Sequence, residues 1–286
     1  MGLKSLAKRC RDFLVEPLEY RLQVMEDSLA VWNREARLEQ ERQARRYDDP
    51  LCLTRHGYRN FSQFDEDGLI DETFRRVGIT SRFFVEFGVG TGLENNTVAL
   101  LLQGWKGLWI EADPASCTRI RDEFREPLES GQLTLLGKFV TAENIEELFD
   151  GAGVPPEPDF LGIDIDGNDF WTWRAIQRFR PRVVLIEYNA SLGRSARIVR
   201  PYDPAARWDM TTCAGASLGS LEDLGRGKGY SLVGCCLAGV NALFVRSDLA
   251  GDRFLAPFTS EKHYEPPRYG RHGGGHTPRW GSFLST

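Results

Sequence analysis

The sequence predicts an α/β fold in which a mostly parallel β-sheet alternates with helices and ends in an antiparallel hairpin. The first indication is the apolar run 83–89, which breaks into a glycine-rich turn and leads into a helical stretch at 95–102. The second is the next apolar run, 107–110, which ends in acidic residues. Strand, glycine turn, helix, strand and carboxylate together are typical of a nucleotide-binding half of a Rossmann-like sheet.

The remaining elements complete this architecture. Further strands are expected at 133–140, 160–165, 183–188, 230–235 and 241–245, with helices at 142–149 and 217–227. The spacing Ser62-x-x-Asp65 predicts a capping box that begins a helix ending near Val77. Parallel strands closed by a hairpin describe the seven-stranded sheet of class I methyltransferases. We therefore expect an N-terminal helical extension (1–50), a Rossmann-like domain (51–256) and a Gly/Pro/Arg-rich tail (257–286).

Composition excludes several classes of protein. The 286 residues suffice for one large α/β domain with an extension. The net charge of −5 argues against a general nucleic-acid binder. No apolar run is long enough to span a membrane, and the N-terminus has no signal-peptide core. Six scattered cysteines without a C-x-x-C pair favour structural thiols in a reducing cytoplasm.

The N-terminal extension carries an apolar stripe at alternating spacings of four and three residues. Its members are Leu18, Leu22, Met25, Leu29, Trp32 and Ala36. Such a stripe must be buried, either against the chain's own domain or in a short coiled coil that makes a homodimer through residues 18–36. The preceding segment mixes apolar and basic residues, which suits either peripheral contact with an anionic membrane or a frayed terminus.

The glycine turn favours S-adenosylmethionine over NAD. Its pattern is Glu86-x-Gly-x-Gly-x-Gly, and Glu86 would repel a pyrophosphate but attract an α-ammonium group. Glu111 lies about twenty residues further on, where a carboxylate can accept hydrogen bonds from the ribose hydroxyls. The expected cofactor-binding residues are Glu86, Gly88, Gly90, Gly92, Asn95, Glu111 and Asp113, with Thr141 and Ala142 at the adenine edge.

Acidic side chains follow the fourth and fifth expected strands. Asp164, Asp166 and Glu187 are candidate catalytic residues, because ligands of open α/β sheets lie beyond the carboxyl ends of the strands. One interpretation is metal-free general-base catalysis. Another is a Mg²⁺ site formed by Asp164, Glu187 and Asn189, in which the metal would lower the pKa of an acceptor hydroxyl. A third is structural, since Asp166-Gly-Asn168 is also a favourable turn sequence.

Seven stretches, in order, carry a family resemblance. They are SQFDEDGLI (62–70), FFVEFGVGTGLENNT (83–97), GWKGLWIEAD (104–113), LGIDIDGNDFWTW (161–173), RPRVVLIEYNAS (180–191), GASLGSLEDLGRGKGYSLVGC (215–235) and GVNALFVRSDL (239–249). Together they resemble the FkbM-like family of S-adenosylmethionine-dependent methyltransferases. The resemblance implies a Rossmann-like fold and O-methylation of saccharides or other hydroxylated metabolites. It covers residues 60–250, so the N-terminal helix and the tail lie outside it.

Residues after the fifth strand are candidates for contacting the acceptor. Asn189, Arg194, Tyr202 and Trp208 are expected there, and the arginines Arg197, Arg200, Arg207, Arg268 and Arg271 either hold a phosphorylated acceptor or form a solvated rim. His272 and His276 are separated by three glycines, which favours a mobile tail over a metal pair.

Two rival functions remain open from the sequence. A catalytically inactive methyltransferase-like module could serve assembly through residues 1–46, although the intact glycine turn argues against it. An NAD-linked oxidoreductase is disfavoured by the turn pattern and by the lack of a Tyr-Lys or His proton relay.

Overall fold

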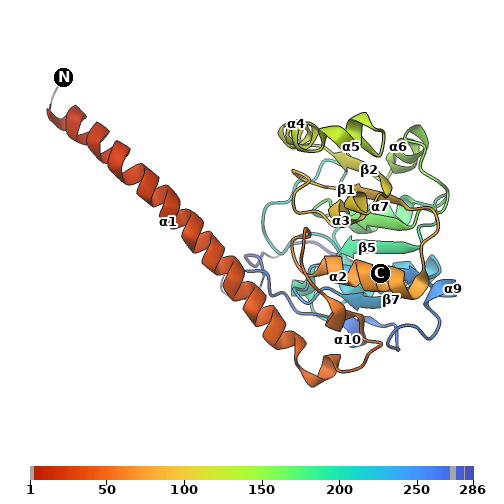
Figure 1. Ribbon diagram of the computed structural model, residues 1–286. Coiled ribbons are helices and arrows are strands. Elements are labelled where there is room, and N and C mark those ends of the chain that lie inside the picture. The colour runs from red at the N-terminus through yellow and green to blue at the C-terminus, as the bar shows by residue number, and fades with distance from the viewer. Residues whose placement is uncertain (1–2, 271–274, 280) are drawn as a thin grey trace.

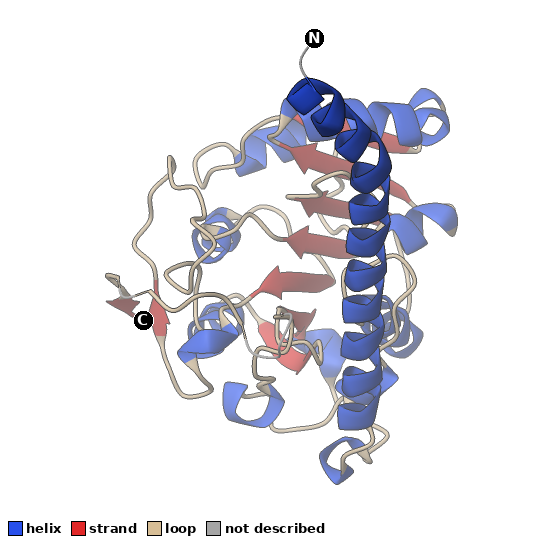
Figure 2. Cartoon of the chain, turned by 90° about the vertical axis from the view of Figure 1, so that its left-hand side faces the viewer, coloured by secondary structure: helices blue, strands red, loops and turns tan. Residues whose placement is uncertain are grey.

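The computed structural model describes residues 3–270, 275–279 and 281–286, with side chains from residue 20 onward except at position 27. A β-sheet forms the centre of the molecule (Figure 2). It has seven strands in the order β3-β2-β1-β4-β5-β8-β7. This is the strand order of the Rossmann-like class I methyltransferase fold. The predicted fold class is therefore confirmed.

The first five strands are parallel and all lie where the sequence predicts strands. They are β1 (Phe83–Phe87), β2 (Lys106–Glu111), β3 (Leu133–Gly137), β4 (Phe160–Ile163) and β5 (Val183–Glu187). The expected hairpin is formed by β7 (Tyr230–Cys235) and β8 (Asn241–Arg246), and β8 pairs antiparallel with β5. Because β1 and β4 are neighbours, the glycine turn after β1 and the acidic loop after β4 meet at one edge of the sheet.

Helices cover both faces of the sheet. One face packs against α2 (Glu66–Val77), α3 (Val98–Leu102), α4 (Pro114–Glu123) and α5 (Arg125–Glu129). The other packs against α6 (Ile145–Gly151), α7 (Asp169–Ala175) and α8 (Leu218–Gly227). On β1, Phe84 joins the first core, whereas Val85 and Phe87 join the second, as the alternation of side chains along a strand requires. Glu86 therefore shares the face of α2 and α3.

The predicted capping box at Ser62 is wrong. Helix α2 begins after Asp65, whose side chain does not cap it; this carboxylate pairs with Arg42 at 3.1 Å and accepts a hydrogen bond from the Leu237 amide at 3.0 Å. Asp67 accepts hydrogen bonds from three successive loop amides, the last being that of Ser62 at 2.9 Å. The acidic residues of this motif fold the loop and join it to distant segments, which is why the local capping pattern does not form.

The N-terminal helix α1 (Leu3–Arg42) is a long rod whose first half projects away from the domain (Figure 1). The predicted apolar stripe is exposed: the exposed fractions are 60% for Met25 and for Leu29 and 77% for Trp32. The helix meets the domain near its other end instead, where Leu38 is buried. Burial of the stripe against its own domain is therefore wrong, and pairing with a second copy stays a prediction. The side chain of Leu18 and those of the basic segment before it lie outside the described residues.

The tail after residue 257 packs more closely than its composition suggests. Its buried Glu265 accepts hydrogen bonds from Arg46 at 2.6 Å, Tyr47 at 2.8 Å and Arg268 at 2.9 Å.

Short elements complete the chain: η1 (Arg45–Tyr47), η2 (Leu53–His56), η3 (Ala190–Leu192), β6 (Ile198–Val199), α9 (Ser247–Ala250), α10 (Ser260–His263) and β9 (Leu284–Ser285). Within the described ranges, no helix is both long and apolar enough to cross a membrane.

Candidate active site

The glycine turn closes tightly over the ends of β1 and β4. Gly88, Gly90 and Gly92 have positive φ angles of 78°, 53° and 79°, which other L-residues rarely adopt. A β-carbon on Gly88 would lie 1.5 Å from the carbonyl oxygen of Asp164. The turn thus needs glycine both for its conformation and for its approach to the acidic loop.

Glu86 anchors the start of α3. It is buried, and its carboxylate accepts hydrogen bonds from the backbone and side-chain amides of Asn96, at 2.9 and 3.0 Å, and from the Thr97 hydroxyl at 2.6 Å. Burial raises the pKa of Glu86, and these hydrogen bonds oppose that rise. Contact of Glu86 with an α-ammonium group stays a prediction, because the structure assigns its carboxylate to the loop.

Asn95 is the unsatisfied polar group of this turn. Its side chain is 4% exposed, and neither amide atom has a hydrogen-bond partner among the described residues. A buried amide without partners costs about 1–3 kcal/mol. Donor and acceptor capacity is therefore available at the turn for a ligand that carries charged or polar groups.

Glu111 joins the end of β2 to the glycine turn. Its buried carboxylate accepts hydrogen bonds from the Gly90 amide at 2.7 Å and from the Asp113 amide at 2.8 Å. Asp113 instead caps α4 by accepting a hydrogen bond from the Ser116 amide at 2.7 Å, and this bond lowers the pKa of Asp113. Of the two predicted residues, Glu111 is the one whose carboxylate reaches the turn.

Tyr202 lies against the presumed adenine edge. Its hydroxyl accepts a hydrogen bond from the Ala142 amide at 3.2 Å and donates one to Glu143 at 2.6 Å. The neighbouring Thr141 amide donates to the side chain of Asn144 at 2.9 Å. The structure therefore brings Tyr202 to the loop after β3, whereas the sequence suggested that it contacts the acceptor.

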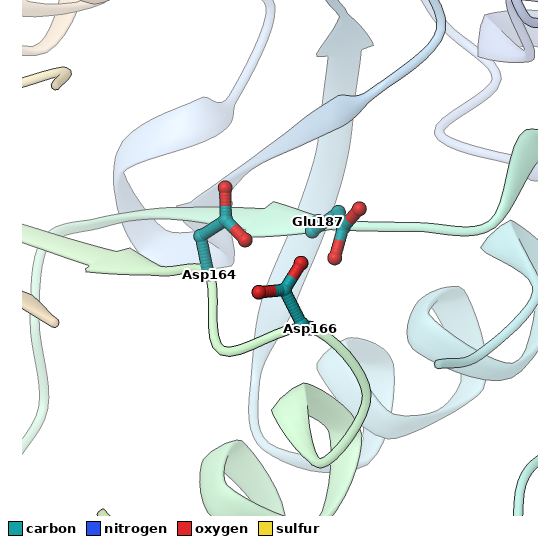
Figure 3. A group of neighbouring side chains, drawn as sticks. All are labelled: Asp164, Asp166 and Glu187. Carbon is teal, nitrogen blue, oxygen red and sulfur yellow. The ribbon is translucent and has the colours of Figure 1, made fainter. Parts of the chain in front are cut away.

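Three carboxylates converge where β4 and β5 end. Figure 3 shows the side chains of Asp164, Asp166 and Glu187 turned toward one another, and each has an oxygen within 4.8 Å of the others. Burial, reinforced by the neighbouring negative charges, raises the pKa values of Asp164 and Glu187 well above those of free carboxyls. A raised pKa makes each of these carboxylates, once ionised, a stronger base than a free one.

Asp169 positions this acidic loop, a role that sequence reasoning missed. It accepts hydrogen bonds from the amides of Ile165 and Gly167, each at 2.8 Å, so that the chain turns back between β4 and α7. Asp166 sits inside this turn with a φ of 57°. Burial raises the pKa of Asp169 to about 6.

Asn189 faces the same cavity but uses its amide elsewhere. The side-chain nitrogen donates to the carbonyls of Thr212 at 2.8 Å and Ala214 at 2.9 Å, and its oxygen accepts from the Ser191 amide at 3.1 Å. Asp166 joins Asp164 and Glu187 in the converging group, and Asn189 lines the same cavity. Metal binding by Asn189 stays a prediction.

The carboxylates face a cavity of about 280 Å³. Trp208 and Asn189 also line it, whereas Arg194 does not and instead lies with its guanidinium 5.9 Å from the ring centre of Tyr264. Three further walls come from segments outside the family resemblance: Arg34 from α1, and Tyr269 and His276 from the tail.

The tail residue His276 lies between two aromatic rings, and mobility of the glycine run before it stays a prediction. Its imidazole lies 4.5 Å from the ring centre of Trp208 and 4.8 Å from that of Tyr269. Burial lowers the pKa of His276, although Asp166 opposes this effect. His272, the other half of the suggested pair, lies outside the described residues.

Comparison with known proteins finds similarity only among solved structures. No protein-family model matches the sequence, and no curated protein matches it. An S-adenosylmethionine-dependent methyltransferase from Clostridium acetobutylicum resembles the chain with 10% identity and a TM-score of 0.40, over 62% of this chain and 88% of that one. The pyocyanin biosynthetic protein PhzM does so with 16% identity and a TM-score of 0.37, over 62% and 54%. The chain thus spans about half of PhzM, and these likenesses are too weak to assign a function.

The residues that sequence reasoning missed had one faint signal. Arg34 precedes the buried Leu38 by four residues, so the two lie on one face of α1, apart from the apolar stripe. Tyr269 belongs to no recognisable motif, and His276 stood out only as half of a suggested metal pair; only the folded chain brings both to the cavity.

Proposed function

We propose that the protein is an S-adenosylmethionine-dependent O-methyltransferase that acts on a hydroxyl of a saccharide, a glycan precursor or a similar metabolite. The observation that carries this proposal is the close approach of the Gly88 backbone to Asp164. It joins a turn suited to the methyl donor to a cavity lined by proton-accepting carboxylates, as methyl transfer to a hydroxyl requires.

The turn offers donor and acceptor groups that fit this cofactor. The unpartnered side-chain amide of Asn95 suits the charged methionine end of the cofactor. Glu111 suits the ribose hydroxyls, which would replace the Gly90 amide as hydrogen-bond donors to its carboxylate. S-adenosylmethionine supplies an electrophilic methyl group when bound. The protein's part is to orient the cofactor and the acceptor and to exclude water.

The acceptor hydroxyl loses its proton to the carboxylate group. A carboxylate with a raised pKa is a stronger base than a free one, and the burial that raises the pKa values of Asp164 and Glu187 supports this role for them. The proton moves from the acceptor oxygen to a carboxylate oxygen as the new carbon–oxygen bond forms. Asp166, the most exposed of the three, can pass the proton on to solvent.

A Mg²⁺-assisted version of the same reaction uses the same residues. Asp164, Asp166 and Glu187 together offer the oxygen ligands that Mg²⁺ prefers. A bound cation would also relieve the repulsion between these carboxylates and lower the pKa of the acceptor hydroxyl.

Calorimetry with S-adenosylmethionine, S-adenosylhomocysteine and NAD tests the cofactor. We expect both methionine-derived ligands to bind in the micromolar range, and Glu111→Ala to weaken them by about 1.5–3 kcal/mol, while the exposed Glu123→Ala leaves them unchanged. Binding of NAD alone would instead support an oxidoreductase.

Transfer of a labelled methyl group to a panel of hydroxylated acceptors tests the reaction. Tight cofactor binding without transfer to any acceptor would support the inactive assembly module. The five cysteines with described side chains are buried and form no disulfide, which fits the cytoplasm that we propose as the location.

A further inference from the structure

The N-terminal helix contributes a positive charge to the acceptor cavity. Arg34 lines the cavity, and its guanidinium lies 4.8 Å from the ring centre of Phe64. Phe64 is buried and belongs to the SQFDEDGLI stretch of the domain. A cation over an aromatic face is stabilised electrostatically, so the domain itself holds the Arg34 side chain in place.

The guanidinium of Arg34 keeps at least one unpaired donor among the described residues. Its Nε atom is buried and has no hydrogen-bond partner in the described part of the chain. The ion pair with Glu35 has a nitrogen-to-oxygen distance of 3.9 Å, too long for a hydrogen bond. The guanidinium fork is therefore available to a ligand.

Arg34 is the one side chain with a permanent positive charge among the described residues that line this cavity. The other basic group is His276, whose pKa is lowered by burial. Facing them are Asp164, Asp166 and Glu187. An anionic acceptor would be repelled by these carboxylates unless its charge were placed at Arg34.

The arginines expected at the acceptor are engaged elsewhere. Arg197 pairs with Asp223 at 2.5 Å, Arg200 donates to the Cys213 carbonyl at 2.7 Å, and Arg268 pairs with Glu265. Arg207 lies over the ring of Phe139 at 4.1 Å, and Arg271 lies outside the described residues. The cluster that the sequence suggested for a phosphorylated acceptor is thus dispersed, and α1 provides the charge instead.

We propose that the acceptor carries an anionic substituent, a carboxylate or a phosphate, which Arg34 binds through its guanidinium fork. This inference rests on the proposed methyl transfer to a hydroxyl. A guanidinium can bind either anion through two parallel hydrogen bonds. The rings of Trp208 and Tyr269 then contact the acceptor's apolar faces, and its reacting hydroxyl lies at the carboxylates. Arg34 thereby determines which hydroxyl is methylated.

Space for a larger acceptor adjoins this position. Arg34 and Tyr269 also line a second cavity of about 770 Å³, which runs along α1 and includes Arg37 and Asn33. The substituent bound by Arg34 would therefore lie where the acceptor continues from one cavity into the other, as a glycan chain longer than one sugar would require.

The experiment compares glucose, glucuronic acid and glucose 6-phosphate, together with short neutral and uronic-acid-containing oligosaccharides, as ligands and as methyl acceptors. The variants are Arg34→Gln and Arg34→Lys, with the exposed Arg21→Gln as a control on the same helix. We expect wild-type protein to favour anionic over neutral probes, and Arg34→Gln to lower kcat/KM and affinity for them roughly 10- to 100-fold. Arg34→Lys should restore part of the loss, and neutral probes, cofactor affinity and Arg21→Gln should be unaffected.

The comparison of glucuronic acid with glucose 6-phosphate shows whether Arg34 binds a carboxylate or a phosphate. Three results would overturn the inference. The wild type could bind neutral and anionic probes equally, or every anionic probe could fail to bind at millimolar concentration. The third is that Arg34→Gln loses affinity equally for both classes of probe. Binding is measured without turnover, so anionic probes that bind through Arg34 but are never methylated would refute the proposed function and leave the anion site standing.

Discussion

The backbone of Gly88 leaves no room for a side chain, because the carbonyl oxygen of Asp164 lies 1.5 Å from the position that a β-carbon would occupy. The glycine turn and the acidic loop are therefore fixed relative to each other by direct contact. The sheet sets their separation, since β1 and β4 are paired in register from Phe84 to Phe87.

Gly88→Ala should disrupt both parts of the site. A matched control is Gly104→Ala, where φ is similarly positive, 82°, but no atom lies within 4 Å of the new β-carbon. Both variants should lose about 1 kcal/mol of stability from backbone strain. Gly88→Ala should lose several kcal/mol more and should no longer bind S-adenosylmethionine. Urea denaturation and calorimetry measure the two effects, and equal losses in both variants would contradict the contact.

Glu111 and Asp113 should differ in what they support. Asp113→Ala should cost about 1 kcal/mol of stability, because it removes the N-cap of α4, with little effect on cofactor affinity. Glu111→Gln keeps the shape of the side chain but removes the charge, and should weaken cofactor binding more than it weakens the fold. A loss of cofactor affinity in Asp113→Ala as large as that in Glu111→Gln would show that Asp113 contacts the ligand, as the sequence predicted.

Asp164→Asn, Asp166→Asn and Glu187→Gln should each abolish or strongly reduce turnover while cofactor binding persists. The carboxylates face the acceptor cavity, so their loss affects the transition state more than the bound cofactor. Adding a chelator to the wild type separates the two versions of the reaction. Loss of activity that Mg²⁺ restores supports the metal, and full activity in excess chelator leaves the general base alone.

Glu66 should make stability depend on pH. Burial, followed by the charge of Asp65, raises its pKa from 4.5 to about 7. Below pH 4.5 folded and unfolded chains both keep this proton; above it only the folded chain does, so the free energy of unfolding falls as pH rises toward 7, by up to about 3 kcal/mol. Glu66→Gln should remove this part of the slope in urea denaturation between pH 4.5 and 8. Parallel pH profiles for the two proteins would refute the assignment.

Met25→Glu should dissociate the homodimer that we propose for residues 18–36. Met25 is 60% exposed on the apolar stripe, and a charge in the centre of a helix pair should raise the dissociation constant more than about tenfold. Gln23→Ala, on the face of the same helix opposite the stripe, should leave the mass unchanged. Light scattering at tens of micromolar measures both, and a monomeric wild type would exclude this dimer.

The sheet could be predicted from the sequence because each strand carries its own signal. Apolar runs such as that of β1, glycine at the turn and acid at the end of β2 are local patterns, and parallel pairing then follows from the alternation with helices. The convergence of Asp164 and Glu187 was also predictable, since the ends of neighbouring parallel strands meet at one edge.

The walls of the cavity could not be predicted, because long-range contacts position them. Asp65 appeared to be part of a helix cap, yet its partners are Arg42 and the Leu237 amide, from opposite ends of the chain. Tyr202 carried no signal to distinguish the adenine edge from the acceptor cavity. His276 follows a glycine run that by itself favours mobility, and that local pattern gives no sign that its imidazole contacts the rings of Trp208 and Tyr269.

Glu265 joins segments that are very far apart in the chain, since its partners Arg46 and Tyr47 lie 219 and 218 residues away. Strand β1 pairs with β2 across a much shorter loop, as Phe83 lies opposite Lys106. Contacts that close longer loops cost more chain entropy to form, and segments at the rim of a domain can open while its central strands stay paired. The cofactor-binding half would then be formed before the cavity is enclosed. Amides near Glu265 should accordingly exchange with solvent hydrogen sooner than those of β1, by opening of the enclosing segments while the sheet stays folded.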